Sequence, residues 1–189
     1  MARSRNPAHR RDLLAAATRV FGAQGLGAST ASIAEAAGVS TGTLFVHFDT
    51  KSALVNALYV ELKSEMARVA TEGMPVGAPP REQLRHMWDR WVAWCATQPE
   101  KRRALAHLGV AEDLTEDTRA ATRQAYADIA ALVRAIVESG PMHDAPLGFA
   151  LALMSSITDA TIDDLLQSPD PTGIRSALAF DAMWRALAG

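Results

Sequence analysis

Residues 30 to 51 read TASIAEAAGVSTGTLFVHFDTK, and this stretch contains two short helical patterns separated by Gly38. Thr30 is predicted to cap the first helix, whose apolar residues are small enough for close packing. Gly38 predicts a sharp turn, because glycine adopts a positive φ without the steric cost that other residues bear. Ser40 is predicted to cap the second helix, over residues 41–48. The stretch therefore predicts a helix-turn-helix.

The second of these helices has one face for a core and one for a partner. Leu44 and Phe48 are four residues apart and are predicted to point inward. The opposite face is then available to DNA, and it comprises Thr41, Gly42, Thr43, Phe45 and His47. Upstream, an amphipathic helix that Gly25 is predicted to end has its apolar face at Leu13, Leu14, Ala17, Val20 and Phe21. Three helices of this size can bury one small core.

Many positions from the first helix to the start of a fourth follow one family pattern in register. They are Leu14-Ala15-Ala16-Ala17, Phe21, Gly25, Ser29-Thr30, Ile33-Ala34, Ala37-Gly38-Val39-Ser40, Gly42-Thr43-Leu44-Phe45, His47-Phe48, Lys51 and Leu54. This order closely resembles the N-terminal domain of TetR/AcrR-type transcriptional regulators. The resemblance covers residues 8–68, and beyond them only the length and the helical pattern are suitable. Phe45 stands where the family commonly has Tyr, and Thr41 where a basic residue or Pro is often found.

The resemblance implies a function and two domains. A helix-turn-helix DNA-binding domain is expected over residues 8–68, and an effector-binding and dimerisation domain over 69–189. Phosphates of a double-stranded DNA operator would be anchored by Thr30, Thr43 and Lys51, while Thr41, Gly42 and His47 approach base edges. The family implies a homodimeric repressor that a small effector releases from DNA. Release would follow from a shift of the long helix that comes directly after the helix-turn-helix. A DNA-binding dimer without such a switch stays open as an alternative.

The distribution of charge fits this expectation better than its sum. The net charge is −2, yet residues 1–51 hold six Lys/Arg against three Asp/Glu, and the remainder holds 13 against 18. Phosphates would therefore meet the N-terminal part. The first eleven residues include Arg3 and Arg5 and no acid, so they form either an arm along the DNA or a solvated tail.

Composition limits the other classes of function. The 189 residues fit one or two domains, with no long uncharged apolar run and no apolar segment behind the basic N-terminus, so we expect a cytoplasmic protein. The single Cys95 and five scattered histidines predict no metal site and no cofactor. His86 and Asp89 could pose as a base and its orienting acid, but no nucleophile with a supporting motif accompanies them, so no catalytic residue is assigned.

The rest of the chain predicts an all-α protein. Thr50 is predicted to cap a long helix from Lys51 to about Thr71, and the Gly/Pro-rich residues 73–80 form a linker. Further helices are expected at about 81–96, 101–110, from Thr115 to Gly140, 146–167 and 172–187.

Three of the four tryptophans lie in one of these helices. Leu84, Trp88, Trp91 and Cys95 share a face, which is the pattern of either a filled core or an irregular apolar pocket. The resemblance places an effector pocket in this half of the chain. The predicted effector-binding residues are Met87, Trp88, Trp91, Trp94, Tyr126 and Asp159.

The last two helices have more apolar surface than one buried face requires. Either they belong to a thick monomeric core, or their second side meets a second copy in a two-fold four-helix interface, as the resembled family does. The predicted dimer interface comprises Leu151, Met154, Ile157, Phe180 and Trp184.

Overall fold

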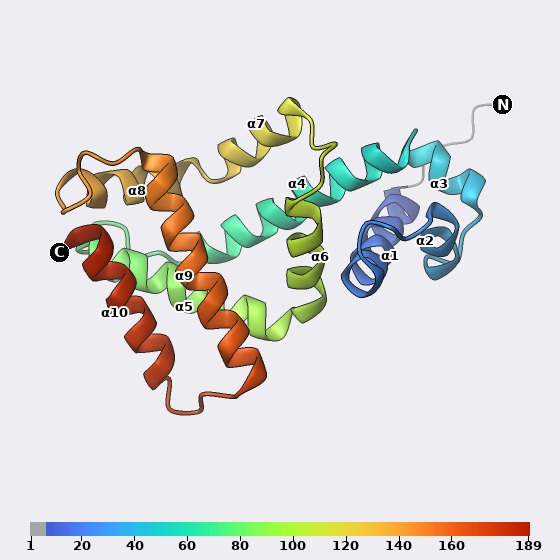
Figure 1. Ribbon diagram of the computed structural model, residues 1–189. Helices are drawn as coiled ribbons and strands as arrows, with labels where there is room; N and C mark the ends of the chain where they lie inside the picture. The colour runs from blue at the N-terminus through green and yellow to red at the C-terminus, as the bar shows by residue number, and fades with distance from the viewer. Residues whose placement is uncertain (1–6) are drawn as a thin grey trace. The chain divides into compact units, whose positions relative to one another are not determined.

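The computed structural model describes residues 7–189, and all regular structure in that range is helical (Figure 1). The helices are α1 (Pro7–Gln24), α2 (Thr30–Ala36), α3 (Thr41–His47), α4 (Lys51–Thr71), α5 (Pro80–Thr97), α6 (Pro99–Gly109), α7 (Glu116–Ala125), α8 (Ala127–Glu138), α9 (Leu147–Gln167) and α10 (Ile174–Ala188). The all-α prediction is confirmed. None of these helices is both long and apolar enough to cross a membrane.

The chain divides into two compact units. Of the described residues, the first unit contains 7–65 together with 98–124, and the second contains 66–97 together with 125–189. The sequence indicated a division near residue 68, and the structure differs by packing residues 98–124 with the N-terminal part. Helix α6 belongs there because Ala104 and Leu108 are fully buried in the core formed by α1 to α4.

Close approach between α1 and α6 explains one glycine. A Cβ built on Gly22 would lie 2.9 Å from the backbone oxygen of Glu100, which is closer than real Cβ contacts. The absence of a side chain at residue 22 therefore sets how near the two helices lie within the first unit.

The termini of the short helices agree only partly with the sequence prediction. The turn at Gly38 has φ of +69°, and Ser40 caps α3 by accepting the Thr43 N–H at 3.1 Å, so both predictions are confirmed. The predicted cap at Thr30 is wrong: Ser29 has the extended backbone of a cap, and its Oγ accepts the Ser32 N–H at 3.0 Å. Two adjacent residues suited to capping left the choice to tertiary packing.

The segment predicted from Thr115 to Gly140 is two helices. Thr115 does cap its start, accepting the Thr118 N–H at 3.2 Å, but Tyr126 interrupts the helical backbone between α7 and α8. The residues of α7 up to 124 pack with the first unit and those of α8 with the second. In the second unit α9 and α10 form an antiparallel pair joined by a short loop (Figure 1).

Candidate nucleic-acid interface and apolar cavity

The second helix of the helix-turn-helix has the two faces that the sequence predicted. Leu44 is fully buried, while Gly42 and Phe45 are exposed, the latter by 43%. Phe48 lies one residue beyond α3 in extended backbone, yet it is still buried in the same core. The face of α3 away from the core thus carries Thr41, Gly42, Phe45 and His47, with Thr41 and His47 half-buried.

Hydrogen bonds give two predicted phosphate ligands a structural role. The Thr43 hydroxyl lies 2.9 Å from the Ser40 hydroxyl, beside the cap of α3. The Lys51 ammonium donates to the backbone oxygen of Leu26 at 2.5 Å and so fixes the loop after α1 to the start of α4. Thr30 lies half-buried in the first turn of α2. An ammonium has three N–H donors, so the bond to Leu26 does not exhaust Lys51.

The basic N-terminus is partly helical. Arg3 and Arg5 lie outside the described residues, but α1 begins at Pro7 and includes Arg10 and Arg11, so these two arginines are not part of an extended arm. The Arg10 guanidinium lies 5.4 Å from the centre of the Phe48 ring and 4.0 Å from the Glu61 carboxylate. The His9 ring meets His47 edge to face, with centres 6.3 Å apart.

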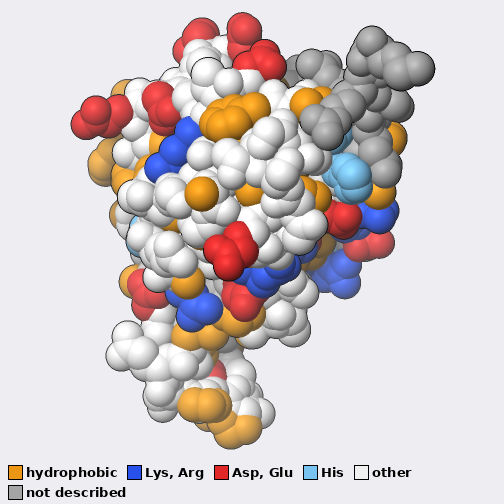
Figure 2. Space-filling view, turned by 90° about the vertical axis from the view of Figure 1, so that its right-hand side faces the viewer, with side chains coloured by type: hydrophobic (Ala, Val, Ile, Leu, Met, Phe, Trp, Pro, Cys, Tyr) orange, Lys and Arg blue, Asp and Glu red, His pale blue; other side chains and the backbone are white. Residues whose placement is uncertain are grey.

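These contacts add His9 and Arg10 to the surface beside α3. The periodicity of α1 could have revealed them, because both residues lie on its polar side at its first turns. On the face drawn in Figure 2, basic and acidic side chains are interspersed rather than separated by sign. The described residues drawn in that view therefore offer DNA separate positive charges and not one broad basic patch.

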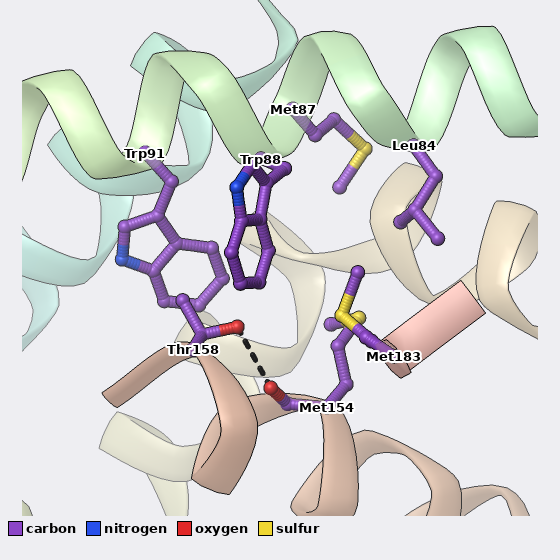
Figure 3. A pocket seen from close by; sticks show the side chains of 7 residues that line it. All are labelled: Leu84, Met87, Trp88, Trp91, Met154, Thr158 and Met183. Carbon is purple, nitrogen blue, oxygen red and sulfur yellow. Dashed lines mark hydrogen bonds between the residues drawn. The ribbon is translucent and has the colours of Figure 1, made fainter. Parts of the chain in front are cut away.

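The tryptophan cluster of α5 lines a small apolar cavity in the second unit. Figure 3 shows Trp88 and Trp91 facing Met154 and Thr158 of α9 and Met183 of α10, and the full lining is Leu84, Met87, Trp88, Trp91, Met154, Thr158 and Met183. The only hydroxyl in the lining, that of Thr158, donates to the Met154 backbone oxygen at 2.7 Å. The cavity measures about 10 Å³, which is room for a single water molecule.

Three of the six predicted effector ligands line this cavity, and three do not. Met87, Trp88 and Trp91 are in the lining. Trp94 is buried elsewhere, Tyr126 packs at the start of α8, and Asp159 is exposed with its carboxylate 3.4 Å from the Ser155 hydroxyl. Trp94, Tyr126 and Asp159 are thus outside the lining of this cavity, and their contacts with an effector stay predictions. The wall of the cavity opposite α5 comes from α9 and α10, the two helices in which the sequence predicted the dimer interface.

Two predicted dimer-interface residues belong to the core of one protomer. Phe180 is only 1% exposed, and its ring meets Trp88 edge to face with centres 6.0 Å apart. Met154 is also buried and lines the cavity. Leu151, Ile157 and Trp184 are half-buried. The exposed apolar side chains of α9 and α10 are instead Phe149, Leu166, Ile174 and Leu178.

Residues that could hold a metal do not come together. Across residues 7–189, no three His, Cys, Asp or Glu side chains form a possible ligand set. His86 binds the backbone oxygen of Glu72 at 2.9 Å, and Asp89 pairs with Arg85, so the two residues do not form a base and its orienting acid.

Two capped helices are joined by a turn at Gly38, and the second has one face in the core and the other outward. This arrangement is a helix-turn-helix, as in many DNA-binding domains. Residues 13–58 match the family model of bacterial regulatory proteins, tetR family. The chain is 25% identical to a putative TetR family transcription regulator from Shewanella sp. PV-4, with a TM-score of 0.86 over 96% of this chain and 98% of that one. It is 24% identical to a TetR family transcription regulator from Marinobacter aquaeolei VT8, with a TM-score of 0.85 over 96% of each chain.

A more distant solved structure has a bound compound. The TetR-like regulator LfrR from Mycobacterium smegmatis, in complex with proflavine, is 17% identical, with a TM-score of 0.65 over 95% of this chain and 94% of that one. The N-terminal part of the chain therefore matches the tetR family of bacterial regulatory proteins, and the chain shares the fold of solved TetR family transcription regulators along nearly its whole length.

Proposed function

We propose that this protein is a cytoplasmic homodimeric repressor, without enzymatic activity, that binds a pseudo-palindromic operator and is released from it by a small apolar effector. The observation that carries the DNA-binding part is the geometry of α3. Its buried Leu44 fixes one face in the core, and its opposite face presents a glycine, a threonine and two aromatic side chains to solvent.

Recognition of the DNA bases is assigned to the exposed face of α3. Thr41, Gly42 and His47 would approach base edges, while Phe45 offers an apolar contact for thymine methyl groups. Phosphate contacts are assigned to the remaining donors of Lys51, to Thr30 and Thr43, and to Arg3 and Arg5. His9 and Arg10 extend this surface at the start of α1.

Gly42 offers a variant that separates DNA binding from folding. A Cβ added at this exposed position would meet only the Ser40 hydroxyl, at 3.7 Å, so Gly42→Ala fits the fold and raises the helix propensity of α3. The added methyl group would keep bases and phosphates away from the helix backbone. Gly109→Ala is the matched control, because its Cβ would meet nothing within 4 Å at the end of α6.

The experiment is selection of bound duplexes from random sequence, followed by footprinting with the full chain. A two-fold symmetric site supports the proposal, and Gly42→Ala should weaken binding or change the selected bases while Gly109→Ala does neither. Equal behaviour of both variants and the unaltered protein would remove α3 from the interface. Truncation of residues 1–6 should reduce the slope of affinity against salt concentration.

Dimer formation is assigned to the outer faces of α9 and α10. Phe149 and Leu178 are 58% and 61% exposed, and large exposed apolar side chains on neighbouring helices are typical of interfaces. Two heads are also required to read the two half-sites of a palindrome. Leu151, Ile157 and Trp184 would lie at the edge of this interface.

Effector release is assigned to the Trp88 and Trp91 cavity. Because the cavity holds about one water molecule, a ligand must displace a side chain, and the half-buried Trp91 is the one nearest to solvent among the large lining residues. The distant relative with bound proflavine makes flat aromatic compounds the first to test. Binding should quench tryptophan fluorescence and weaken operator binding by the coupling between the two sites.

The small size of the cavity favours a second candidate, a DNA-binding dimer without a switch. Fluorescence titration with proflavine and with uncharged aromatic compounds, each repeated with operator DNA present, distinguishes the two. Quenching without any change in operator affinity, or no quenching at all, would leave the switchless dimer in place.

A further inference from the structure

An exposed ion pair lies beside the end of α3 in the first unit. The Arg10 guanidinium of α1 lies 4.0 Å from the Glu61 carboxylate of α4, and the two side chains keep 49% and 48% of their accessible area. The same guanidinium lies 5.4 Å from the centre of the ring of Phe48, the residue directly after α3. Its neighbour on α1, His9, meets His47 of α3 edge to face. The pair is therefore next to the surface to which DNA binding is assigned.

The Phe48 ring supports the Arg10 guanidinium, and Glu61 acts on it only through charge. A distance of 5.4 Å from the ring centre lies within the range of cation–π attraction, while 4.0 Å between nitrogen and carboxylate oxygen is too long for a hydrogen bond. A guanidinium has five N–H donors, and this carboxylate uses none of them. A DNA phosphate that approaches Arg10 can therefore accept hydrogen bonds from a guanidinium that the ring already holds in place.

Positive charge compensates the Glu61 carboxylate only in part. Desolvation raises the pKa of Glu61 above its usual value of 4.5, and this effect outweighs the lowering of that pKa by Arg10. Of the smaller influences on the pKa, that of Glu65 raises it and that of Lys101 lowers it. Lys101 is bound instead to Glu65, whose two carboxylate oxygens both lie 2.7 Å from its ammonium nitrogen. Arg10 is thus the main positive charge that acts on Glu61.

A phosphate and the Glu61 carboxylate compete for the same positive charge. Exposed ion pairs contribute little to folding, so the pair with Arg10 is not needed to hold α1 against α4. Contacts with phosphates, in contrast, supply the part of DNA affinity that does not depend on base sequence. A negative charge at residue 61 therefore lowers DNA affinity, while the base contacts assigned to α3 are unaffected.

We infer that Glu61 limits the affinity of the protein for DNA by competing with a phosphate for Arg10. The effect is the same for the operator and for unrelated DNA, because a phosphate contact carries no sequence information. It also makes each head easier to release, since most differences in affinity between related complexes appear in the dissociation rate. This inference rests on the proposed DNA-binding function and names a residue that restrains it.

The test measures the binding of the full chain to the selected operator and to an unrelated duplex, by fluorescence anisotropy at several salt concentrations. Glu61→Gln should strengthen binding to both duplexes by about two- to fivefold for each bound head, the range expected when an exposed ion pair no longer competes. Arg10→Gln should weaken binding to both, and it should reduce the slope of log affinity against log salt concentration by about one for each head.

A double variant decides whether Glu61 acts through Arg10. In the Arg10→Gln background, Glu61→Gln should change the affinity by less than about 1.5-fold, because no guanidinium remains for which the carboxylate can compete. Glu65→Gln is the matched control, with the same substitution one turn further along α4, where the carboxylate pairs with Lys101. This control should also change the affinity by less than about 1.5-fold.

Each result supports or overturns the inference. An unchanged or weaker affinity of Glu61→Gln would overturn it and leave the proposed function in place. A gain of the same size in the Arg10→Gln background, or in Glu65→Gln, would show a general repulsion between acids and DNA and would also overturn it. If the unaltered protein bound no duplex at any salt concentration, the proposed function and this inference would fail together.

Discussion

Leu178→Asp should weaken dimer formation and Phe180→Ala should weaken folding, although the two residues are only two positions apart on α10. Leu178 is 61% exposed and Phe180 is 1% exposed, so the first is available to a second copy and the second is not. Leu178→Asp should leave each protomer folded, with a free energy of unfolding changed by less than about 0.5 kcal/mol apart from its effect on assembly. Phe180→Ala should cost about 3–5 kcal/mol in folding, as is usual when a buried aromatic side chain is removed.

The effect on assembly follows from the exposed area of Leu178. Full burial of a leucine contributes about 1.5–3 kcal/mol, so the exposed part can contribute about 1–2 kcal/mol in an interface. A two-fold axis counts each residue twice, giving about 2–4 kcal/mol per dimer, or a dissociation constant raised by about 30- to 700-fold. The buried unpaired carboxylate adds to this loss.

Sedimentation velocity across a dilution series measures the assembly, and urea unfolding measures the stability of each variant. Arg134→Asp on α8, another exposed position of the second unit, is the control for added negative charge. An unaltered protein that sediments as a monomer at micromolar concentration, or a Leu178→Asp variant that dimerises as well as the unaltered protein, would refute the reasoning. Dissociation by Phe180→Ala with no loss of folding stability would also do so.

Three further predictions concern the folding of each unit. Gly22→Ala should lower the free energy of unfolding by about 1–3 kcal/mol, because its Cβ would force α1 away from Glu100, and an unchanged urea midpoint would contradict this. Asn56→Ala should lower the free energy of unfolding by about 1–3 kcal/mol, since the buried side-chain amide donates to the Asp113 backbone oxygen at 3.0 Å and accepts the Thr115 N–H at 2.9 Å. Amide hydrogen exchange at Thr115 should become faster in this variant. Desolvation tends to raise the pKa of Asp170, but hydrogen bonds from Thr172, Ser176 and Arg175 hold this pKa below its usual value of 3.8. The ionised Asp170 therefore stabilises the folded state above pH 3.8, and this stabilisation is lost as the pH falls through the lowered pKa. Thermal unfolding from pH 6 to pH 2 should show the unaltered protein losing its advantage over Asp170→Asn.

The DNA-binding head was predictable because its signals are local. A positive φ at Gly38, the Ser40 cap and the inward Leu44 each depend on residues within one turn of the helix, and all three agree with the structure. The choice between Ser29 and Thr30 as the cap of α2 was not predictable, because both residues can accept the bond. Similarly, Lys51 was predicted to bind a DNA phosphate from its place in the family pattern. Its hydrogen bond to the backbone oxygen of Leu26, 25 residues away, could not be predicted from the sequence.

The second unit was less predictable because an apolar residue does not indicate its partner. Met154, Phe180 and Leu178 are all apolar residues at helical spacing, and the sequence placed the first two at a dimer interface. The structure assigns them to the wall of the cavity and to the ring contact with Trp88, while Leu178 faces outward.

For the helix-turn-helix, the sequence by itself determined the two short helices, the turn at Gly38, the cap at Ser40 and the family-like order of residues. These follow from propensity, capping and periodicity within a few residues. Tertiary structure alone decided which faces of α5, α9 and α10 meet, how little space remains beside Trp91, and that two arginines share the ring of Phe180. Those properties depend on packing between side chains up to about a hundred residues apart, such as Arg81 and Asp181, which share a hydrogen bond. No local pattern specifies such a pair, because its free energy exists only once the chain has folded.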